Sequence, residues 1–338
     1  MSGKPNSIAV ATVATRSHIA LSRTLLGSVA KRMPSAARFL LLVDSIEATT
    51  PAHIEGATIL HPSEIVTASE FRSLTSRYTA PEVCFALKPR ILLHLLTLGF
   101  EQVHYLDSDA WLIGPLDEAV ELLRSSSALL TPHLYARRTL GTSHATSDLD
   151  LLMAGTFNAG YVAVSQRPEA SKFLHWWGDR TYRWGYNLPL LGMCGDQRWL
   201  DLVPRIFEGI EIWRIPGLNA GYWNLGGVHI EREGDMVFVD GHALLMLHLS
   251  GFDPQQPHRM SRFVNHVVLE AEPVLAGILR EYAETLLHNG YREDRHAEYA
   301  HRSWLHGSSL PVRTLRALSV LYRLKRARKS ERSHTNAT

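Results

Sequence analysis

The sequence predicts an α/β protein with a largely parallel central sheet. Short apolar runs alternate with stretches of helical periodicity through the first two-thirds of the chain, which is typical of such sheets. One run, residues 39–43, is apolar throughout, as expected of a strand buried on both faces. The apolar share of 45% over 338 residues is normal for a chain with a sizeable core, and the length suits two domains or one α/β domain with an appendage.

The first predicted elements follow in chain order. Residues 8–13 form a strand, and apolar residues near helical spacing predict a helix over 19–32 that ends before Pro34. Strands follow at 39–43 and 57–60, and Pro62-Ser-Glu opens a further helix. We expect Pro89 to open the next helix and Gly99 to close it; its apolar stripe is Ile91, Leu92, Leu95 and Leu96.

The later elements are shorter. A strand at 103–106 runs directly into Asp107, Ser108 and Asp109. Further strands are predicted at 160–164, 236–239 and 244–249, among loops rich in Trp, Gly and Asn, and residues 270–328 are expected to be helical. Six tryptophans lie between residues 176 and 223, and core packing is favoured for each over a sugar-binding surface.

Composition excludes several classes of protein. Two cysteines cannot build a disulfide scaffold or a zinc site, and residues 1–7 hold no apolar signal core. The longest apolar stretch, 91–100, is about half a membrane span, so we expect a soluble, cytoplasmic protein. The net charge is only +2, and eight Lys and Arg residues fall in the tail from 311 to 338. Because the basic excess is not in the folded body, no nucleic-acid partner is expected.

Asp107 and Asp109 are the central candidates for chemistry. They follow an apolar strand two residues apart, so alternation along a strand would place both carboxylates on one side. Hard oxygen ligands suit Mg²⁺ or Mn²⁺, which keeps coordination positions open for a diphosphate and acts as a Lewis acid on the departing phosphate. The plainer alternative is an exposed loop that happens to contain Asp-x-Asp.

His248 is the expected third metal ligand. It ends the predicted strand before Ser250 and Gly251, and a neutral imidazole would complete a two-carboxylate, one-histidine set suited to Mn²⁺. The alternative is a hydrogen-bonded core or surface histidine. Gly251 permits close approach of the backbone to a phosphate.

Other residues could bind a sugar. Asp196 and Gln197 pair a carboxylate with an amide that could fix hydroxyl groups or stabilise a cationic anomeric carbon, although Asp196 could equally cap a helix after Gly195. Lys88 could neutralise phosphate charge. The Asn-Ala-Gly stretches at 158–160 and 219–221 are interpreted first as turns.

Taken together, these motifs resemble GT-A nucleotide-sugar glycosyltransferases, most closely the family 8-like bacterial group. The resemblance covers roughly residues 8–254 and rests on seven stretches in order, at 9–16, 85–89, 105–109, 157–160, 195–199, 219–224 and 248–252. It implies a GT-A fold with a mixed central sheet, which we assign to residues 1–270. The helical stretch that follows predicts a C-terminal helical extension with a basic tail over 271–330, and the polar end at 331–338 is expected to be disordered.

The resemblance also implies roles for individual residues. Asp107, Asp109 and His248 would ligate the divalent metal, Mn²⁺ or Mg²⁺. The donor-binding residues would be Thr12 and Ala14 at the base and ribose, Lys88, Asp107, Ser108, Asn158, Gly160 and Gly251. Asp196 and Gln197 would be catalytic residues at the reacting carbon. Members of the family usually take a UDP-sugar and retain its anomeric configuration.

The sequence departs from the family pattern in two places. The Lys-Pro-Trp that often follows the His-x-x-Gly motif is missing; Asp253 and Pro254 stand there, with Arg259 and Arg262 further on. Ser17 and His18 stand where relatives often have Asn-Tyr.

The functional hypothesis is transfer of a sugar from a nucleotide diphosphate, UDP by preference, to a glycan, lipid-linked or protein hydroxyl in cell-surface polysaccharide or glycolipid synthesis. Front-face attack would retain configuration, with Asp196 or Gln197 steadying the cationic sugar; in an inverting reaction Asp196 would be the base. Two rivals are a haloacid dehalogenase-type phosphatase with Asp107 as nucleophile and a catalytically silent sugar- or nucleotide-binding protein.

The basic C-terminal helix offers a membrane hypothesis. Leu315, Leu318 and Tyr322 with the surrounding cations could form an amphipathic helix on the inner face of a membrane, or a solvated helix packed on the body.

Overall fold

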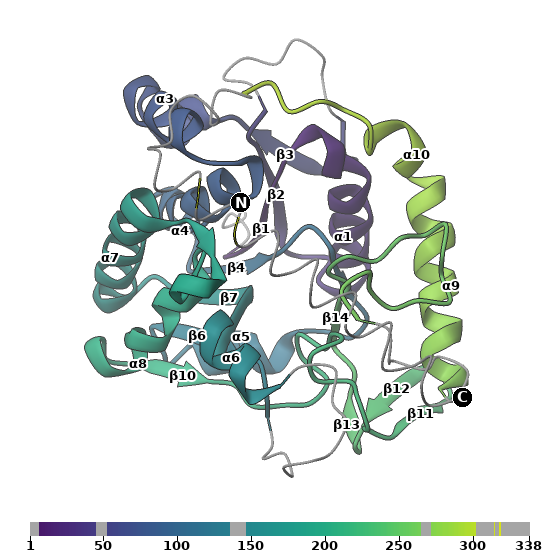
Figure 1. The fold of residues 1–338 in the computed structure, drawn as a ribbon. Coiled ribbons are helices and arrows are strands. Elements are labelled where there is room, and N and C mark those ends of the chain that lie inside the picture. Colours follow the sequence, from purple (N-terminus) through teal and green to yellow (C-terminus); the bar gives the residue numbers. More distant parts are fainter. Residues whose placement is uncertain are drawn as a thin grey trace, which may run out of the picture.

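The fold is built around a mixed seven-stranded sheet. A computed structural model describes residues 7–44, 53–135, 147–264 and 272–301, together with Thr314 and Leu318. Within these residues the strand order is β10-β6-β7-β4-β1-β2-β3 (Figure 1). The strands are β1 (Ile8–Ala14), β2 (Ala37–Leu42), β3 (Ala57–Leu60), β4 (Gln102–Leu106), β6 (Ala128–Pro132), β7 (Phe157–Ser165) and β10 (Ile210–Ile212).

Most neighbouring strands of this sheet are parallel. β4, β1, β2 and β3 pair in parallel, as do β10 and β6, whereas β7 runs antiparallel to both β4 and β6. The α/β class with a mixed, mostly parallel sheet that the sequence predicts is therefore confirmed. Since β1, β2 and β4 are parallel, their carboxyl ends share one edge, which is where ligands bind in open α/β sheets.

Helices cover both faces of the sheet (Figure 1). One face packs under α1 (Ile19–Arg32) and α5 (Asp117–Leu123), and their buried residues join one apolar cluster with side chains of β1, β4 and β7. The opposite face packs under α3 (Ala68–Arg77), α4 (Ala80–Thr97) and α7 (Pro168–Trp184) in a second cluster. The short helices are α2 (Pro62–Ile65), α6 (Asp148–Ala154) and α8 (Val203–Ile206), with 3-10 turns at Arg16–His18, Pro189–Leu191 and Gln197–Leu202.

A third apolar cluster joins smaller sheets to the C-terminal helices α9 (Pro273–His288) and α10 (Tyr291–Asp294). β14 (Met246–His248) pairs with β5 (Ala110–Leu112), an arrangement that forms part of the candidate site. The other short strands are β8 (Asn187–Leu188), β9 (Met193–Cys194), β11 (Ile230–Glu233), β12 (Met236–Val239) and β13 (His242–Ala243).

The prediction that Pro89 opens a helix is wrong. α4 begins nine residues earlier, at Ala80, because Thr79 and Glu82 form a capping box in which the Glu82 carboxylate accepts from the Thr79 N–H at 2.8 Å. A proline within a helix costs about 3 kcal/mol, and burial of a single large apolar side chain returns a similar amount. Core side chains lie on both sides of Pro89, which keeps the helix continuous through it. The predicted closure at Gly99, which has φ +96°, is confirmed.

Two further predictions need correction. Asn158 and Gly160 do not form a turn, since they lie within β7. The strand predicted over 244–249 is shortened to β14 at 246–248, because the backbone N–H groups of residues 244 and 245 donate to Val237 and Gly217 before the pairing with β5 begins.

The tryptophans and the C-terminus give mixed outcomes. Trp177, Trp213 and Trp223 are buried as predicted, whereas Trp184 is 48% exposed. α9 and α10 meet the helical prediction for 270–328 over residues 273–288 and 291–294, whereas residues 295–301 form no helix. Thr314 and Leu318 are helical, and Leu315, Tyr322 and the tail at 331–338 lie outside the described residues. Among the helices described, none is long and apolar enough to cross a membrane.

Leu95 and Leu98 offer a test of the packing of α4. Leu95 is completely buried, while Leu98, three residues later, is 58% exposed. We expect Leu95→Ala to lower the free energy of unfolding by about 2–5 kcal/mol, because it leaves a cavity. Leu98→Ala should change it by less than about 0.5 kcal/mol. Urea unfolding measures both values, and equal losses would contradict this placement of the helix.

Candidate metal and substrate site

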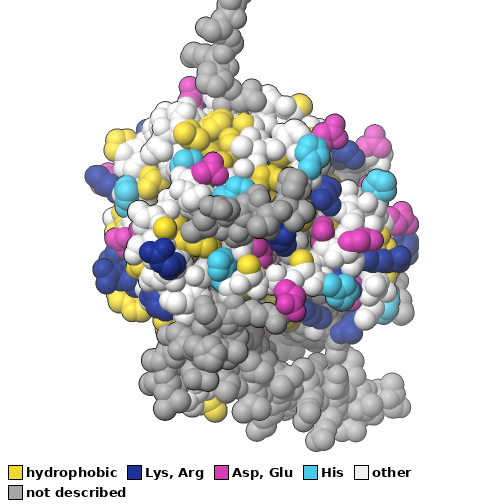
Figure 2. Space-filling model, turned by 90° about the horizontal axis from the view of Figure 1, so that it is seen from above, with side chains coloured by type: hydrophobic (Ala, Val, Ile, Leu, Met, Phe, Trp, Pro, Cys, Tyr) yellow, Lys and Arg dark blue, Asp and Glu magenta, His cyan; other side chains and the backbone are white. Residues whose placement is uncertain are grey.

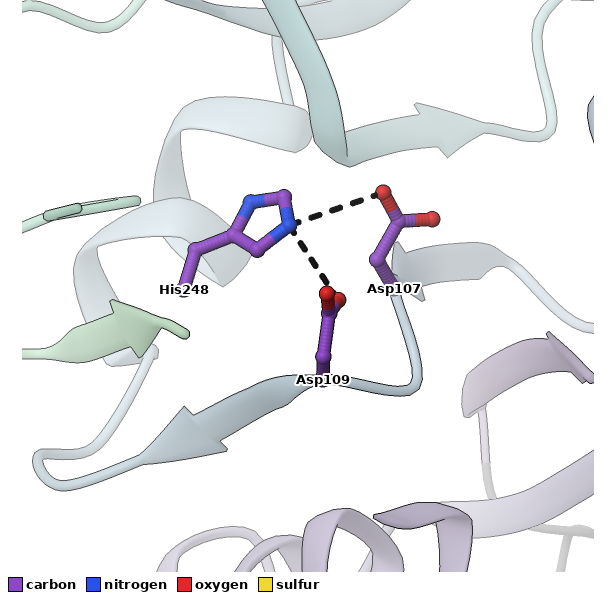
Figure 3. A group of neighbouring side chains, drawn as sticks. All are labelled: Asp107, Asp109 and His248. Atoms are coloured by element: carbon purple, nitrogen blue, oxygen red, sulfur yellow. Dashed lines mark ion pairs between the residues drawn. The ribbon is translucent and has the colours of Figure 1, made fainter. Parts of the chain in front are cut away.

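The candidate site lies where β4 ends and the chain turns into β5. Asp107 follows β4, and a turn closed by the Ala110 N–H and the Asp107 carbonyl at 2.9 Å carries Asp109. β14 pairs antiparallel with β5 and sets His248 opposite Ala110. Residues about 140 positions apart in the sequence therefore face one another (Figure 3).

The three predicted metal ligands converge. His248 Nε2 lies 3.2 Å from Asp109 Oδ1 and 3.8 Å from Asp107 Oδ2 (Figure 3). One ligand atom from each residue falls within 4.8 Å of the others. Two carboxylate oxygens and one imidazole nitrogen suit Mn²⁺ or Mg²⁺, and both aspartate side chains are 26% exposed. The cluster is therefore compatible with a divalent metal.

The carboxylates converge for a different reason from the one that the sequence suggested. Strand alternation was expected to place Asp107 and Asp109 on one side, but both belong to a turn between two strands. The turn reverses the chain, and the pairing of β5 with β14 then carries Asp109 to His248.

Three buried residues hold the imidazole in place. His248 Nδ1 lies 2.9 Å from Asn219 Oδ1, and the Asn219 amide nitrogen donates to Asn158 Oδ1 at 3.1 Å. A hydrogen bond at Nδ1 directs Nε2 toward the aspartates, as is usual for metal-binding histidines. Gly160 leaves room for the ring, because a Cβ at that position would lie 2.2 Å from His248 Cε1 and Nδ1. Asn158 and Gly160 thus support the site through His248.

Lys88 forms the second part of the site. Its side chain is 1% exposed, and Nζ lies 2.6 Å from Asp196 Oδ2, 3.1 Å from Asp107 Oδ1 and 2.9 Å from the Ala159 carbonyl oxygen, to which it donates. Asp196 does not cap a helix through its side chain. Gly195, at φ +55°, allows the loop to approach α4, since a Cβ there would meet the Phe85 ring at 2.5 Å.

Burial and neighbouring charges shift the pKa values of His248, Lys88 and Asp196. Burial lowers the pKa of His248, but the Asp109 and Asp107 carboxylates outweigh this effect and the pKa is raised. Burial also acts against the charged Lys88, whose pKa is nevertheless raised by Asp107 and Asp196. For Asp196 burial dominates and raises the pKa, although Lys88 opposes it. The cluster is thus a coupled set of opposite charges.

The remaining predicted site residues lie in four parts of the chain. Thr12 is fully buried within β1 and Ala14 is nearly so, at the carboxyl end of the strand. Ser108 lies in the turn between the two aspartates. Gln197 donates its amide N–H to the Ala154 carbonyl at 3.0 Å. Gly251 has φ +74°, and a Cβ there would meet the Phe263 ring at 2.7 Å.

Three supporting residues were not predicted. The Tyr105 hydroxyl donates to Asp107 Oδ1 at 2.8 Å, the Trp177 indole N–H donates to the Asp196 carbonyl at 2.9 Å, and Asn219 orients His248. The Tyr105 contact could have been predicted, because side chains two residues apart along a strand point to the same face and Tyr105 stands two residues before Asp107. Trp177 and Asn219 lie on remote segments, and no local pattern points to their partners.

Comparisons with known proteins give distant matches. No family model matches the sequence. The uncharacterized protein YfnF of Bacillus subtilis (strain 168) is 27% identical over 207 residues, which cover 57% of this chain and 67% of YfnF. The uncharacterized protein YfnD of the same organism is 22% identical over 256 residues, covering 71% of this chain and 76% of YfnD.

Solved structures are more remote. The galactosyltransferase LgtC in complex with donor and acceptor sugar analogs has a TM-score of 0.41 and 13% identity, over 82% of this chain and 99% of LgtC. The glycosyltransferase GlyE of Streptococcus pneumoniae TIGR4, in its apo form, has a TM-score of 0.43 and 16% identity, over 82% of this chain and 64% of GlyE.

Gly160 tests whether metal binding depends on the position of the His248 ring. Gly160→Ala adds a methyl group that would force the imidazole to move, so we expect Mn²⁺ affinity to fall about 10–100-fold. Gly277→Ala in α9 is the control, because nothing lies within 4 Å of its added Cβ. Titration calorimetry with Mn²⁺ measures the affinity; unchanged binding by a folded Gly160→Ala protein would contradict the assignment.

Proposed function

We propose that this protein is a metal-dependent glycosyltransferase that moves a sugar from a nucleotide diphosphate donor, with UDP favoured, to an acceptor hydroxyl. The observation that carries the proposal is the Asp107, Asp109 and His248 cluster at the carboxyl edge of the sheet, next to the buried Lys88 and Asp196. A metal ion held by the two carboxylates and the imidazole would bind the diphosphate at one end of the site. At the other end, the Asp196 carboxylate would stabilise the positive charge that develops on the sugar.

The chain's own residues would hold the reactants. Asp107, Asp109 and His248 would hold Mn²⁺ or Mg²⁺, which when bound supplies a Lewis acid for the departing diphosphate. Asn219 and Gly160 keep the His248 ring in position for this role. Ser108, Gly251 and the carboxyl end of β1 at Ala14 belong to the proposed donor site.

Lys88 and Asp196 would act on the sugar end of the donor. Asp196 is 3% exposed and paired with Lys88, an arrangement that favours electrostatic stabilisation of a cationic anomeric carbon over proton abstraction. We therefore favour front-face attack with retention, with Gln197 beside the reacting carbon. Analysis of the product's anomeric configuration tests this choice.

The acceptor hydroxyl would belong to a glycan, a lipid-linked glycan or a protein, and the reaction would serve cell-surface polysaccharide or glycolipid synthesis. The enzyme would act in the cytoplasm, where its basic C-terminal helix would contact the membrane surface.

Donor hydrolysis gives the direct test. The protein with Mn²⁺ and a panel of nucleotide sugars should release the nucleotide diphosphate, and Asp109→Asn should reduce the rate at least about 100-fold by removing a metal ligand. Asp117→Asn, an exposed acid in the first turn of α5, is the control and should leave the rate unchanged. Release of free phosphate from sugar phosphates without nucleotide dependence would instead support a phosphatase.

The charge of the site points to an additional cation. Asp107, Asp109 and Asp196 carry three negative charges, which Lys88 and a dication would neutralise, and a bound diphosphate diester adds about two more. The backbone N–H of Arg262 donates to the Gly251 carbonyl at 2.9 Å. Burial lowers the pKa of His18, the Asp109 charge raises it, and the Arg262 guanidinium lowers it further. Arg262, which is exposed, is therefore the proposed diphosphate cation.

Arg262→Ala should weaken the binding of UDP more than the binding of UMP. Loss of one charge-assisted contact is worth about 1.5–3 kcal/mol, or roughly a 10–100-fold loss for UDP in the presence of Mn²⁺. Arg292→Ala, an exposed arginine of α10, is the control. Fluorescence or calorimetric titration with both nucleotides measures the ratio. Equal effects on UDP and UMP would contradict a contact with the outer phosphate.

A further inference from the structure

The segment that follows α10 crosses the carboxyl edge of the sheet. We call residues 295–301 the strap. It runs from α10 over the ends of the central strands toward α3 (Figure 1). On the face seen from above, acidic and basic side chains are mixed, and neither sign of charge gathers in one patch (Figure 2). Because nucleotides would bind beyond these strand ends, the strap lies where a donor must enter.

One end of the strap is held by the loop after His248. The Arg295 guanidinium donates to Gln255 Oε1 at 3.1 Å and lies 3.9 Å from Asp253 Oδ1. It also stacks over the Tyr291 ring at 5.3 Å. The start of the strap is therefore held by the loop that follows His248 and contains Gly251.

The other end is held at the end of β2. The His301 ring packs edge-on against Phe71 at 5.2 Å and against Tyr299 at 5.5 Å. Asp44 lies two residues beyond the end of β2 and is 1% exposed. Its Oδ2 accepts a hydrogen bond from the backbone N–H of Arg16, and the backbone N–H of Ala300 also donates to this carboxylate. The strap is thus fastened across the ends of β1 and β2.

Polar atoms without partners gather under the strap. Tyr299 Oη, Asp44 Oδ1 and His301 Nε2 are all buried, and none has a hydrogen-bond partner among the described residues. A buried polar group without a partner costs about 1–3 kcal/mol. Three of them in one place are unfavourable for stability alone, and they indicate a place for a polar ligand.

These atoms adjoin the proposed active site. Tyr299 and Cys84 both pack against the apolar cluster that covers one face of the sheet. Cys84 lies in α4 one turn before Lys88. The unpartnered atoms therefore lie next to the α4 side of the site, at a place suited to the base of a nucleotide whose diphosphate is at the metal.

Building on the proposed function, we propose that the strap forms a wall of the nucleobase site, where Tyr299 and Asp44 read a base edge that carries a carbonyl beside a ring N–H. On uracil, the Tyr299 O–H would donate to the C4 carbonyl oxygen, and Asp44 Oδ1 would accept from the N3–H. Cytosine presents an amino group at C4 and an unprotonated N3 at these two positions, so both contacts are lost.

Tyr299→Phe removes only the hydroxyl and keeps the ring packing. With Mn²⁺ present, we expect UDP affinity to fall about five- to tenfold, the value of one net hydrogen bond, and CDP affinity to stay unchanged. Tyr182→Phe, which removes a hydroxyl from α7, is the control and should leave the UDP to CDP ratio at the wild-type value. Calorimetric titration of the full-length variants measures the ratio.

Hydrogen exchange gives a second readout that needs no mutation. A base held under Tyr299 should slow amide exchange over residues 295–301, and UDP with Mn²⁺ should do so where pyrophosphate with Mn²⁺ does not. An unchanged UDP to CDP ratio in Tyr299→Phe, or equal protection by pyrophosphate, would overturn the inference. If the wild-type protein binds no nucleoside diphosphate with Mn²⁺, the proposed function itself fails.

Discussion

The pairing of β5 with β14 is the constraint on which the candidate site depends. It places His248 opposite Ala110, so that the imidazole meets the carboxylates of the preceding turn. The antiparallel register also continues beyond the strand, since the Leu249 N–H donates to the Asp109 carbonyl at 2.9 Å. A shift of one residue would turn His248 to the opposite face, because strand side chains alternate. The metal cluster thus depends on a short sheet outside the main one.

The buried ion pairs around Lys88 are a second constraint. A lysine that is 1% exposed is tolerated only because Asp196, Asp107 and the Ala159 carbonyl surround its ammonium group. Removing one partner of such a group typically costs about 3–5 kcal/mol. The same contacts fix Asp107 from the side opposite His248, so the stability of α4 and the geometry of the proposed metal site are coupled.

The sequence predicted more of the fold than of the contacts. The helix over 19–32 and the strand at 57–60 were predicted at their observed bounds, since periodicity and proline positions are local signals. The start of α4 was missed because a capping box at Thr79 outweighs a proline at 89, and packing decides between the two. The sequence predicted that Asp107, Asp109 and His248 lie together, but not the geometry that brings them together, because the turn at 107–110 and the β5–β14 pairing depend on tertiary contacts.

The departures from the family pattern are related to one another through the strap. Where Lys-Pro-Trp is absent, Asp253 instead faces Arg295, a residue that would repel a lysine in the same loop. The pKa of His18, in the 3-10 turn after β1, is lowered chiefly by burial, and the charges of Asp109 and Arg262 act on it in opposite directions. Arg295 of the C-terminal segment thus holds the loop after His248 through Asp253 and Gln255. In the proposed donor site, the strap therefore stands beside a loop that carries no lysine at this position, and contacts to the nucleotide would come from both segments.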